Sequence, residues 1–391
     1  MSDEREIDLT PYTGPAGGWG SMKSLAEINA REKVPPVETL RELGRQNKPE
    51  GFMCVSCAWG KPAKPHLAEF CENGAKATAW ELTSHRVTPE FFEVHTVSEL
   101  LKWKDYDLEQ AGRLTHPLKY DPATDKYVAV SWAEAFANIG AQLQTFDPTK
   151  VIFYASGRAS LETSYMYSLF ARMYGSHNLP DSSNMCHETT SVGLKSAIGS
   201  PVGTIHLEDY EKCDAILFFG QNTGSNSPRF LHPLKECADR GVEIVTFNPL
   251  KERGLERFIN PQNPAQMLTG KATQISTQYH QVKAGGDIAV LMGMCKYAIE
   301  ADDNARAKGE PAVLDHDFIA EHTHGFDAFA EAARTASWES IVHESGLPKQ
   351  AILDAAKVYC RSERVIGVYG MGLTQHVHGS QSIGMLVNLL L

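Results

Sequence analysis

The chain has 391 residues and a formal net charge of −11. This length allows two or three domains with a large core, and the acidic balance argues against nucleic acid or an anionic membrane surface as the main partner. No apolar run reaches membrane-spanning length, the polar start MSDEREIDLTPYTG does not resemble a signal peptide, and the eight cysteines are scattered. We therefore expect a cytoplasmic protein without a membrane span, whose thiols are reduced or bind metal.

The first 110 residues contain a candidate metal site. Residues 1–50 are rich in Pro, Gly and charge, which predicts an extended arm with one short helix over 37–46. Cys54 and Cys57 then form a C-x-x-C pair, and Cys71 follows fourteen residues after Cys57. A C-x-x-C pair places two sulfurs on one tight turn, the geometry that zinc or an iron–sulfur cluster needs. A cluster normally takes four thiolates and three are present, so a metal site, a redox pair and two packed thiols all remain open.

The next segment predicts a helix, a strand and a second helix. Apolar residues at helical spacing over 89–110 predict the first helix. A short strand is expected over 127–130. Ser131 is placed to cap a helix that begins at Trp132, with Glu134 in its first turn.

From residue 151 onward one theme repeats, an apolar strand followed by a polar loop and a helix. The strands are expected over the four runs 151–154, 215–219, 242–247 and 365–369. This alternation predicts an α/β fold of Rossmann-like type, in which helices cover both faces of a parallel sheet and ligands bind at the carboxyl ends of the strands. None of the loops is a G-x-G-x-x-G or Walker loop, so ordinary dinucleotide dehydrogenases and P-loop enzymes are disfavoured.

Two features near the end of the chain add to this pattern. The loop KAGGD over 283–287 precedes an apolar helix expected over 288–297, and Asp287 either caps that helix or accepts hydrogen bonds from a nucleobase or ribose. The run 382–391 predicts an apolar helix that stops without a polar cap. We therefore expect the sequence to be a piece of a longer chain.

The stretch from 176 to 228 predicts a reactive centre beside a nucleotide-like ligand. Cys186 and His187 place a soft thiolate and a proton acceptor in one dipeptide, and the loop GQNTGSNSP over 220–228 offers N–H groups and hydroxyls for phosphates. An inert buried cysteine is the bland alternative. A nucleophile–base pair in a metal-free hydrolase is another, although adjacent side chains seldom point the same way.

Taken together, the motifs resemble those of the molybdopterin oxidoreductases, and most closely the N-terminal half of the formate-dehydrogenase-like alpha subunits. After C-x-x-C come GRLTHPL, SWAEA, Gly157-Arg158, Cys186-His187, GQNTGSNSP, TFNP, KAGGD and GMGLTQ, in that order. The similarity runs from about Phe52 to Leu391.

The resemblance implies cofactors and site residues. It implies two molybdopterin guanine dinucleotides that hold molybdenum or tungsten, with Cys186 as the protein ligand of the metal and His187 in proton transfer. It also implies a 4Fe-4S cluster on Cys54, Cys57 and Cys71. The residues implied to bind the pterin cofactor are Gly157, Arg158, Asn222, Ser225, Asn226, Gly286, Asp287, Met371 and Gln375.

The sequence departs from the family pattern in several places. The usual third cluster cysteine shortly after Cys57 is missing, and Asn73 stands where the family has a lysine between cluster and pterin. Glu188 follows the histidine in place of the usual glycine, and a strand end that often reads Asp-Pro-Arg is Asn-Pro-Leu over 248–250. The missing cysteine and lysine imply a cluster that has an unusual ligand, is labile, or is lost. Glu188 would add a carboxylate close to the metal, and Asn-Pro-Leu would weaken one nucleotide contact.

The expected organisation follows from the motifs and the resemblance. Residues 1–110 form an arm and an Fe–S-type domain, 111–181 part of a first α/β domain, and 182–391 a Rossmann-like molybdopterin-nucleotide-binding domain truncated at its C-terminal end. The expected reaction is a two-electron oxidation, formate to carbon dioxide being the first candidate, with electrons leaving through the cluster to an acceptor protein or subunit. The alternatives are a related molybdoenzyme acting on another small substrate, a metal-free Cys/His hydrolase, or a cofactor-free interaction protein.

Overall fold

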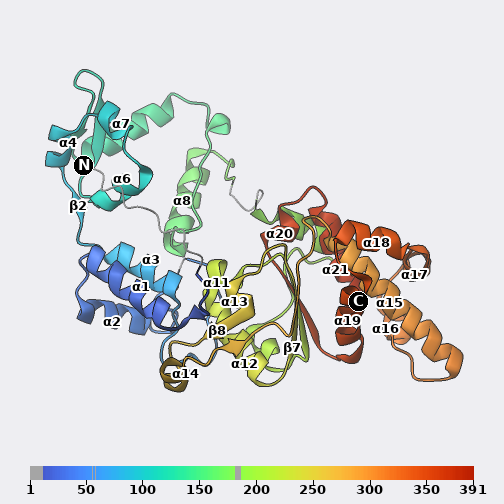
Figure 1. The fold of residues 1–391 in the computed structure, drawn as a ribbon. Helices are drawn as coiled ribbons and strands as arrows, with labels where there is room; N and C mark the ends of the chain where they lie inside the picture. The colour runs from blue at the N-terminus through green and yellow to red at the C-terminus, as the bar shows by residue number, and fades with distance from the viewer. Residues whose placement is uncertain (1–11, 55, 58, 181–185) are drawn as a thin grey trace. The chain divides into compact units, whose positions relative to one another are not determined.

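The computed structural model describes residues 12–54, 56–57, 59–180 and 186–391, which form two compact units (Figure 1). The C-terminal unit joins the described residues up to Met22 with Cys186–Leu391, and the N-terminal unit comprises Lys23–Met185. Each unit is described by itself. No helix among the described residues combines the length and the hydropathy needed to cross a lipid bilayer.

The C-terminal unit is built on a four-stranded parallel sheet of order β10-β7-β6-β11. Its strands are β6 (Ala215–Phe219), β7 (Glu243–Phe247), β10 (Gln278–His280) and β11 (Val365–Tyr369). Every residue of β6 is buried, which explains why the central strand is a continuous apolar run rather than an alternating one. The predicted parallel sheet is confirmed: β6, β7 and β11 begin and end within one residue of expectation, whereas β10 was not predicted.

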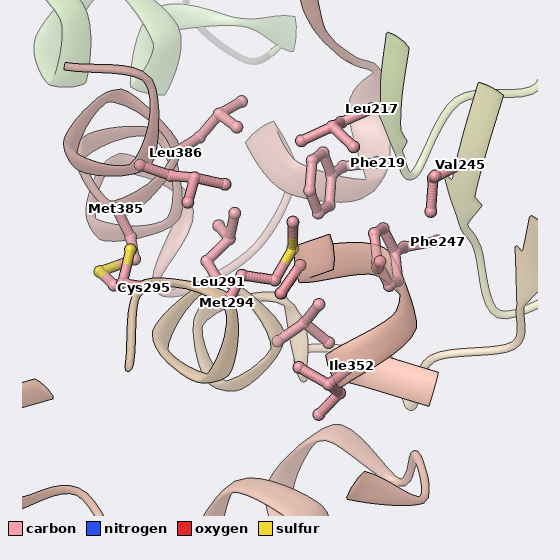
Figure 2. Close-up of a cluster of buried hydrophobic side chains, with 14 of the residues drawn as sticks. Leu217, Phe219, Val245, Phe247, Leu291, Met294, Cys295, Ile352, Met385 and Leu386 are labelled. Carbon is pink, nitrogen blue, oxygen red and sulfur yellow. The ribbon is translucent and has the colours of Figure 1, made fainter. Parts of the chain in front are cut away.

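Helices cover both faces of this sheet. On one face Leu217 and Phe219 share a core with Leu291 and Met294 of α15 (Asp287–Lys308). The same core contains residues of α19 (Lys349–Arg361) and of α21 (Gly379–Leu390), as Figure 2 shows. Side chains alternate along a strand, so Phe218 faces the other way, toward Phe230 and the neighbouring α12 (Leu231–Asp239).

Smaller elements complete the C-terminal unit. Strand β8 (Arg257–Ile259) pairs in parallel with β1 (Ala16–Gly17) and antiparallel with β9 (Thr273–Gln274). The remaining helices, in chain order, are α10 (Glu188–Ile198), α11 (Thr223–Asn226), α13 (Arg253–Glu256), α14 (Pro264–Thr269), α16 (His316–His322), α17 (Phe326–Thr335), α18 (Trp338–Ser345) and α20 (Met371–Thr374).

The N-terminal unit is made of short helices and two small sheets. Strand β2 (Arg86–Val87) pairs with β3 (Arg113–Leu114), and β4 (Leu118–Asp121) pairs with β5 (Lys126–Ala129). Its helices, beginning with one that starts in the other unit, are α1 (Gly18–Arg31), α2 (Pro36–Arg45), α3 (Glu72–Leu82), α4 (Pro89–Val94), α5 (Val97–Leu100), α6 (Asp105–Ala111), α7 (Trp132–Gln144) and α8 (Leu161–Tyr174). The predicted cap of α7 is confirmed, because Ser131 Oγ accepts a hydrogen bond from the Glu134 N–H at 3.1 Å.

Two helix predictions for this part of the chain were wrong. The single helix expected over 89–110 is three helices, because Thr96 and Glu99 form a reciprocal capping box that starts α5 afresh. The arm expected over 1–50 holds α1 as well as the predicted helix, and Ile28 of α1 is buried. The arm's first eleven residues lie outside the described part of the chain.

The strand expected over 151–154 was also wrong. The Phe153 N–H donates to Asn178 O at 2.9 Å, and the Ser176 hydroxyl donates to Val151 O at 2.8 Å. The segment therefore makes its hydrogen bonds to an irregular stretch and not to a neighbouring strand. Ile152 and Tyr154 are largely exposed, so this apolar run lacks the burial that holds β6 in its sheet.

Candidate functional site

Two loops meet at the carboxyl end of the parallel sheet, one following β6 and one following β11. The Gly370 N–H donates to Phe219 O at 3.1 Å, and the Gly372 N–H donates to Gly220 O at 3.2 Å. Gly220 has a φ of +55°, and a Cβ added to it would lie 2.8 Å from Gly372 Cα. Glycine is required here because any side chain would force the two backbones apart.

A third loop adjoins the other two. Gly285, in the segment before α15, has a φ of +81°, and a Cβ there would lie 2.6 Å from His376 Nε2. His376 directly follows the loop after β11. Three glycine-bearing loops thus cluster at the carboxyl edge of the sheet, where open α/β sheets bind ligands.

Cys186 lies against the loop that follows β11. Its Sγ is 3.3 Å from Met371 Sδ, and its carbonyl oxygen accepts a hydrogen bond from Thr374 Oγ1 at 3.0 Å. Thr374 is buried, and its own carbonyl accepts from Thr189 Oγ1 at 3.0 Å. These contacts fix a half-buried thiol beside a thioether sulfur, a soft and polarisable pair. Met185, which precedes Cys186, lies outside the described residues.

His187 and Glu188 follow the thiol at the start of α10. Both residues are exposed, and His187 occupies the N-cap position without a side-chain cap hydrogen bond. The contact of the Cys186 sulfur is with a methionine rather than an imidazole. This arrangement does not favour the metal-free hydrolase, in which the base would need to reach the thiol.

The side chain of Asn222 stabilises the loop after β6 through two hydrogen bonds. Asn222 Oδ1 accepts from the Ser225 N–H at 3.1 Å, and its Nδ2 donates to Glu252 Oε2 at 2.7 Å. Burial raises the pKa of Glu252 above its ordinary value. Asn226 lies in the same short helix, α11, and its N–H donates to Asn222 O at 2.9 Å. The predicted Asn222, Ser225 and Asn226 therefore share one compact turn.

Thr223, in the same turn, was not predicted as a site residue from the sequence. Its side chain is fully buried, and its hydroxyl oxygen has no hydrogen-bond partner among the described residues. Nothing in the pattern of the loop distinguishes this threonine from its polar neighbours. Buried unpaired polar atoms are rare and concentrate at functional sites, so Thr223 supports assigning this loop to the site.

Gly286 and Asp287 begin α15. The side-chain cap considered for Asp287 is wrong, because Gly286 occupies the N-cap position and Asp287 is the first helical residue. Asp287 is buried, and loss of solvent around its carboxyl raises the pKa to about 6. A Cβ on Gly286 would lie 2.8 Å from Glu344 O, so glycine is needed for the close packing of this loop.

Met371 and Gln375 lie at the two ends of the short helix α20. The Gln375 N–H donates to Met371 O at 2.9 Å, and the Gln375 side chain is exposed. The structure thus gathers Cys186, Met371 and Gln375 around one turn.

The other predicted residues belong to the N-terminal unit. Gly157 and Arg158 form an exposed turn, in which the Arg158 N–H donates to Ser156 Oγ at 3.2 Å. The structure does not bring this turn, or the three cluster cysteines, into the same unit as Cys186.

The three N-terminal cysteines lie near one another. Cys54 Sγ accepts from the Ser56 N–H and Cys71 Sγ from the Gly74 N–H, both at 3.4 Å. Burial raises the pKa of Cys71 to about 11, the Gly74 N–H opposes that rise, and negative charge at Cys57 and Cys54 adds to it. Gly74 adjoins two of the three thiols, because its N–H donates to Cys71 Sγ and a Cβ added to it would lie 3.1 Å from Cys54 Sγ.

The described residues contain no group of side chains arranged to bind a single metal ion. Among those residues, no three His, Cys, Asp or Glu side chains are grouped to hold one. A cluster spaces its thiolates around an inorganic core, so it requires a different arrangement. A cluster on these cysteines therefore stays a prediction.

Residues 113–391 match the family model described as Molybdopterin oxidoreductase. The chain belongs to this family. Molybdopterin oxidoreductases carry a molybdenum– or tungsten–pterin cofactor, which family membership implies for this chain. The glycine-bearing loops and the half-buried thiol beside Met371 fit such a group, because a soft thiolate suits the metal and loop N–H groups suit anionic nucleotides.

The chain is also similar to several curated proteins. "Protein YdeP" of Escherichia coli is 50% identical over 384 residues, which cover 98% of this chain and 50% of that protein. "Uncharacterized oxidoreductase Rv2900c" of Mycobacterium tuberculosis is 37% identical, and the match covers 100% of this chain and 49% of that protein. "F420-dependent formate dehydrogenase subunit alpha" of Methanocaldococcus jannaschii is 27% identical, covering 72% and 37%. The chain spans about half the length of the first two.

A solved structure shares the fold of this molybdopterin oxidoreductase. Acetylene hydratase from Pelobacter acetylenicus superposes with a TM-score of 0.59 at 16% identity, covering 84% of this chain and 39% of that one.

Proposed function

We propose that this chain supplies the metal-binding thiolate and the nucleotide-binding loops of a molybdopterin-dependent enzyme that oxidises a small substrate by two electrons. Formate is the first candidate. The observation that carries the proposal is the position of Cys186 Sγ, 3.3 Å from Met371 Sδ at the loop-bearing edge of the sheet. A protein thiolate is the donor that a metal held by dithiolene sulfurs accepts most readily.

The cofactor, when bound, supplies the redox chemistry by accepting the electron pair. Formate oxidation releases one proton and two electrons for each carbon dioxide formed, so the chain must supply a proton acceptor. His187 follows Cys186 in the sequence and is exposed, which supports it as the group that would take that proton and release it to water. Glu188 adds a second exposed group that can exchange protons with solvent.

The loops bind the nucleotide parts of the two molybdopterin guanine dinucleotides. Asn222, Ser225 and Asn226 would hold one nucleotide, and Gly286 and Asp287 another. Asn222 already caps its own turn, so it acts by shaping that turn. The buried Asp287 carboxyl at the start of α15 is suited to accept hydrogen bonds from a guanine edge. Gln375 would contact the pterin or phosphates, and a role of Gly157 and Arg158 in cofactor binding stays a prediction.

Electrons would leave through a 4Fe-4S cluster on Cys54, Cys57 and Cys71, and from there to an acceptor protein or subunit. The support is that Cys54 and Cys71 both adjoin Gly74, together with the two N–H···S hydrogen bonds, a kind of contact that tunes cluster potentials. The name of the Methanocaldococcus relative agrees with formate as the substrate.

A dye-reduction assay tests this function. The full gene product, made anaerobically in a host that synthesises the cofactor, should reduce a viologen dye when formate is added and not otherwise. A matched Cys186→Ala preparation should be inactive. Cofactor-loaded protein that ignores formate but turns over another small oxidisable or reducible substrate would support the related molybdoenzyme and rule out formate.

A further inference from the structure

Gln46 follows α2 in the N-terminal unit and is 1% exposed. Its Nε2 donates to Gly74 O at 3.1 Å and to Thr78 Oγ1 at 2.9 Å. A carbonyl oxygen such as Gly74 O can only accept, so these contacts fix which end of the amide is the nitrogen. The other end, Oε1, has no hydrogen-bond partner among the described residues.

An amide oxygen in this position is unusual. Buried polar atoms in folded proteins are nearly always paired, and leaving one unpaired is destabilising. The neighbouring Asn47 illustrates the rule, since its Nδ2 donates to Glu69 O at 2.6 Å and its Oδ1 accepts from the Cys54 N–H at 2.9 Å. Both amides are fully buried, and only that of Gln46 is left with an unused acceptor.

The unused oxygen lies close to Cys54. A Cβ added to Gly74 would be 3.1 Å from Cys54 Sγ and 3.4 Å from Gln46 Oε1, so both atoms border the same small volume. The Gly74 N–H donates to Cys71 Sγ at 3.4 Å. Helices α2 and α3, which bring Gln46 and Gly74 together, contact each other.

We propose that the side-chain oxygen of Gln46 is the fourth protein donor to the iron–sulfur cluster held by Cys54, Cys57 and Cys71. The inference rests on the proposed function, which places a cluster on these cysteines. Three thiolates leave one iron without a protein ligand, and the structure holds one unpaired, buried oxygen beside them. An amide oxygen cannot donate a hydrogen bond to a cluster sulfide, so coordination to iron is the role left to it.

A fourth donor of this kind has a measurable consequence. Oxygen is a harder ligand than thiolate and binds iron of a cluster less firmly. One iron of the cluster should therefore give a distinct spectroscopic signal, and the binding of that iron should require the side chain of Gln46. The other three irons should depend on the cysteines.

Three variants separate coordination from packing. Gln46→Leu keeps the buried volume but removes the oxygen. Gln46→Glu keeps an oxygen at the same reach. Thr78→Val is the matched control, because it removes one hydrogen bond of the Gln46 amide while leaving its oxygen in place. Each is made in the full gene product, purified anaerobically, and examined for iron content and by Mössbauer spectroscopy.

The expected result is that Gln46→Leu loses about one iron per chain together with the distinct Mössbauer signal, while Gln46→Glu and Thr78→Val keep both. Unchanged iron and an unchanged spectrum in Gln46→Leu would overturn the inference and leave the cluster intact. An equal loss in Thr78→Val would assign the effect to packing and would also overturn it. Wild-type protein without iron would instead reject the cluster of the proposed function.

Discussion

The sulfur atoms of Cys186 and Met371 lie 3.3 Å apart although 185 residues separate them in the sequence. The contact joins the start of α10 to the loop that follows β11, and Thr374 reinforces it through the Cys186 carbonyl. This contact places a thiol at the loop-bearing edge of a parallel sheet. The central claim, that the Cys186 thiol is the protein ligand of a molybdenum centre, rests on this contact.

The first prediction concerns the thiol itself. Cys186→Ala should lower kcat by at least about a hundredfold, because the metal loses the ligand that sets its reactivity. Most of the pterin should remain bound, since the loops after β6 and before α15 are untouched. Turnover, released pterin and circular dichroism measured on one preparation check this. Undiminished activity in Cys186→Ala would contradict the assignment.

Thr374 is a positioning residue in this account. Thr374→Val removes the hydrogen bond to Cys186 O and should cost about 1 kcal/mol of unfolding free energy and roughly tenfold to a hundredfold in kcat, with little change in KM. Thr374→Ser keeps the hydroxyl and should restore kcat. If Val and Ser behave alike, the hydroxyl does not position Cys186.

His187 should matter for proton transfer rather than for binding. His187→Ala should lower kcat by about a hundredfold or more and change the pH profile, because the proton acceptor beside the thiol is removed. Added imidazole should recover part of the activity. Lys195→Ala, at an exposed position of the same helix, is the matched control and should behave like wild type. An unaltered pH profile in His187→Ala would argue that the proton leaves by another route.

Asp287 predicts a pH dependence of stability. Its carboxyl has a pKa near 6 in the folded protein and about 3.8 when exposed, so the folded state binds more protons between these values. The stability linked to Asp287 is fully present below about pH 4 and is lost as the pH rises through about 6. In cofactor-free protein, Asp287→Asn should flatten this change and raise the unfolding free energy at pH 7 by up to ~3 kcal/mol.

Chemical denaturation at several pH values measures that difference. Asp327→Asn is the control, since Asp327 occupies the first turn of α17 but is exposed. Parallel pH profiles for wild type and Asp287→Asn would show that the carboxyl is not held in a raised-pKa environment.

Part of the fold was predictable because a strand that is buried on both faces is a continuous run of apolar residues in the sequence. Strand β6 is buried on both faces, so its five residues are all apolar and its boundaries could be predicted. The run over 151–154 is equally apolar but has no strand beside it among the described residues, and only the path of the remote segment at Asn178 reveals this. The Thr96–Glu99 capping pattern marks the break before α5 in the sequence. The prediction of a single helix rested instead on the helical spacing of the apolar residues.

The site was predictable as a set of motifs but not as a set of contacts. The order of the motifs indicated Cys186 and Met371, but neither their contact nor the close approach of the two loops at Gly220 and Gly372 could be predicted from it. Thr223 and Gln46 could not have been found, because an unpaired buried atom is defined by what surrounds it and not by its residue type. Asp287 was expected as a possible cap, and only the structure shows that Gly286 occupies the N-cap position and that the carboxyl is buried.

The most direct test of the central claim is the metal and pterin content of the full gene product, isolated from a host that makes the cofactor. The account predicts stoichiometric molybdenum or tungsten together with a guanine-dinucleotide pterin, measured by elemental analysis and by chromatography of the released nucleotide. Protein that folds well and contains neither metal nor pterin would contradict the account.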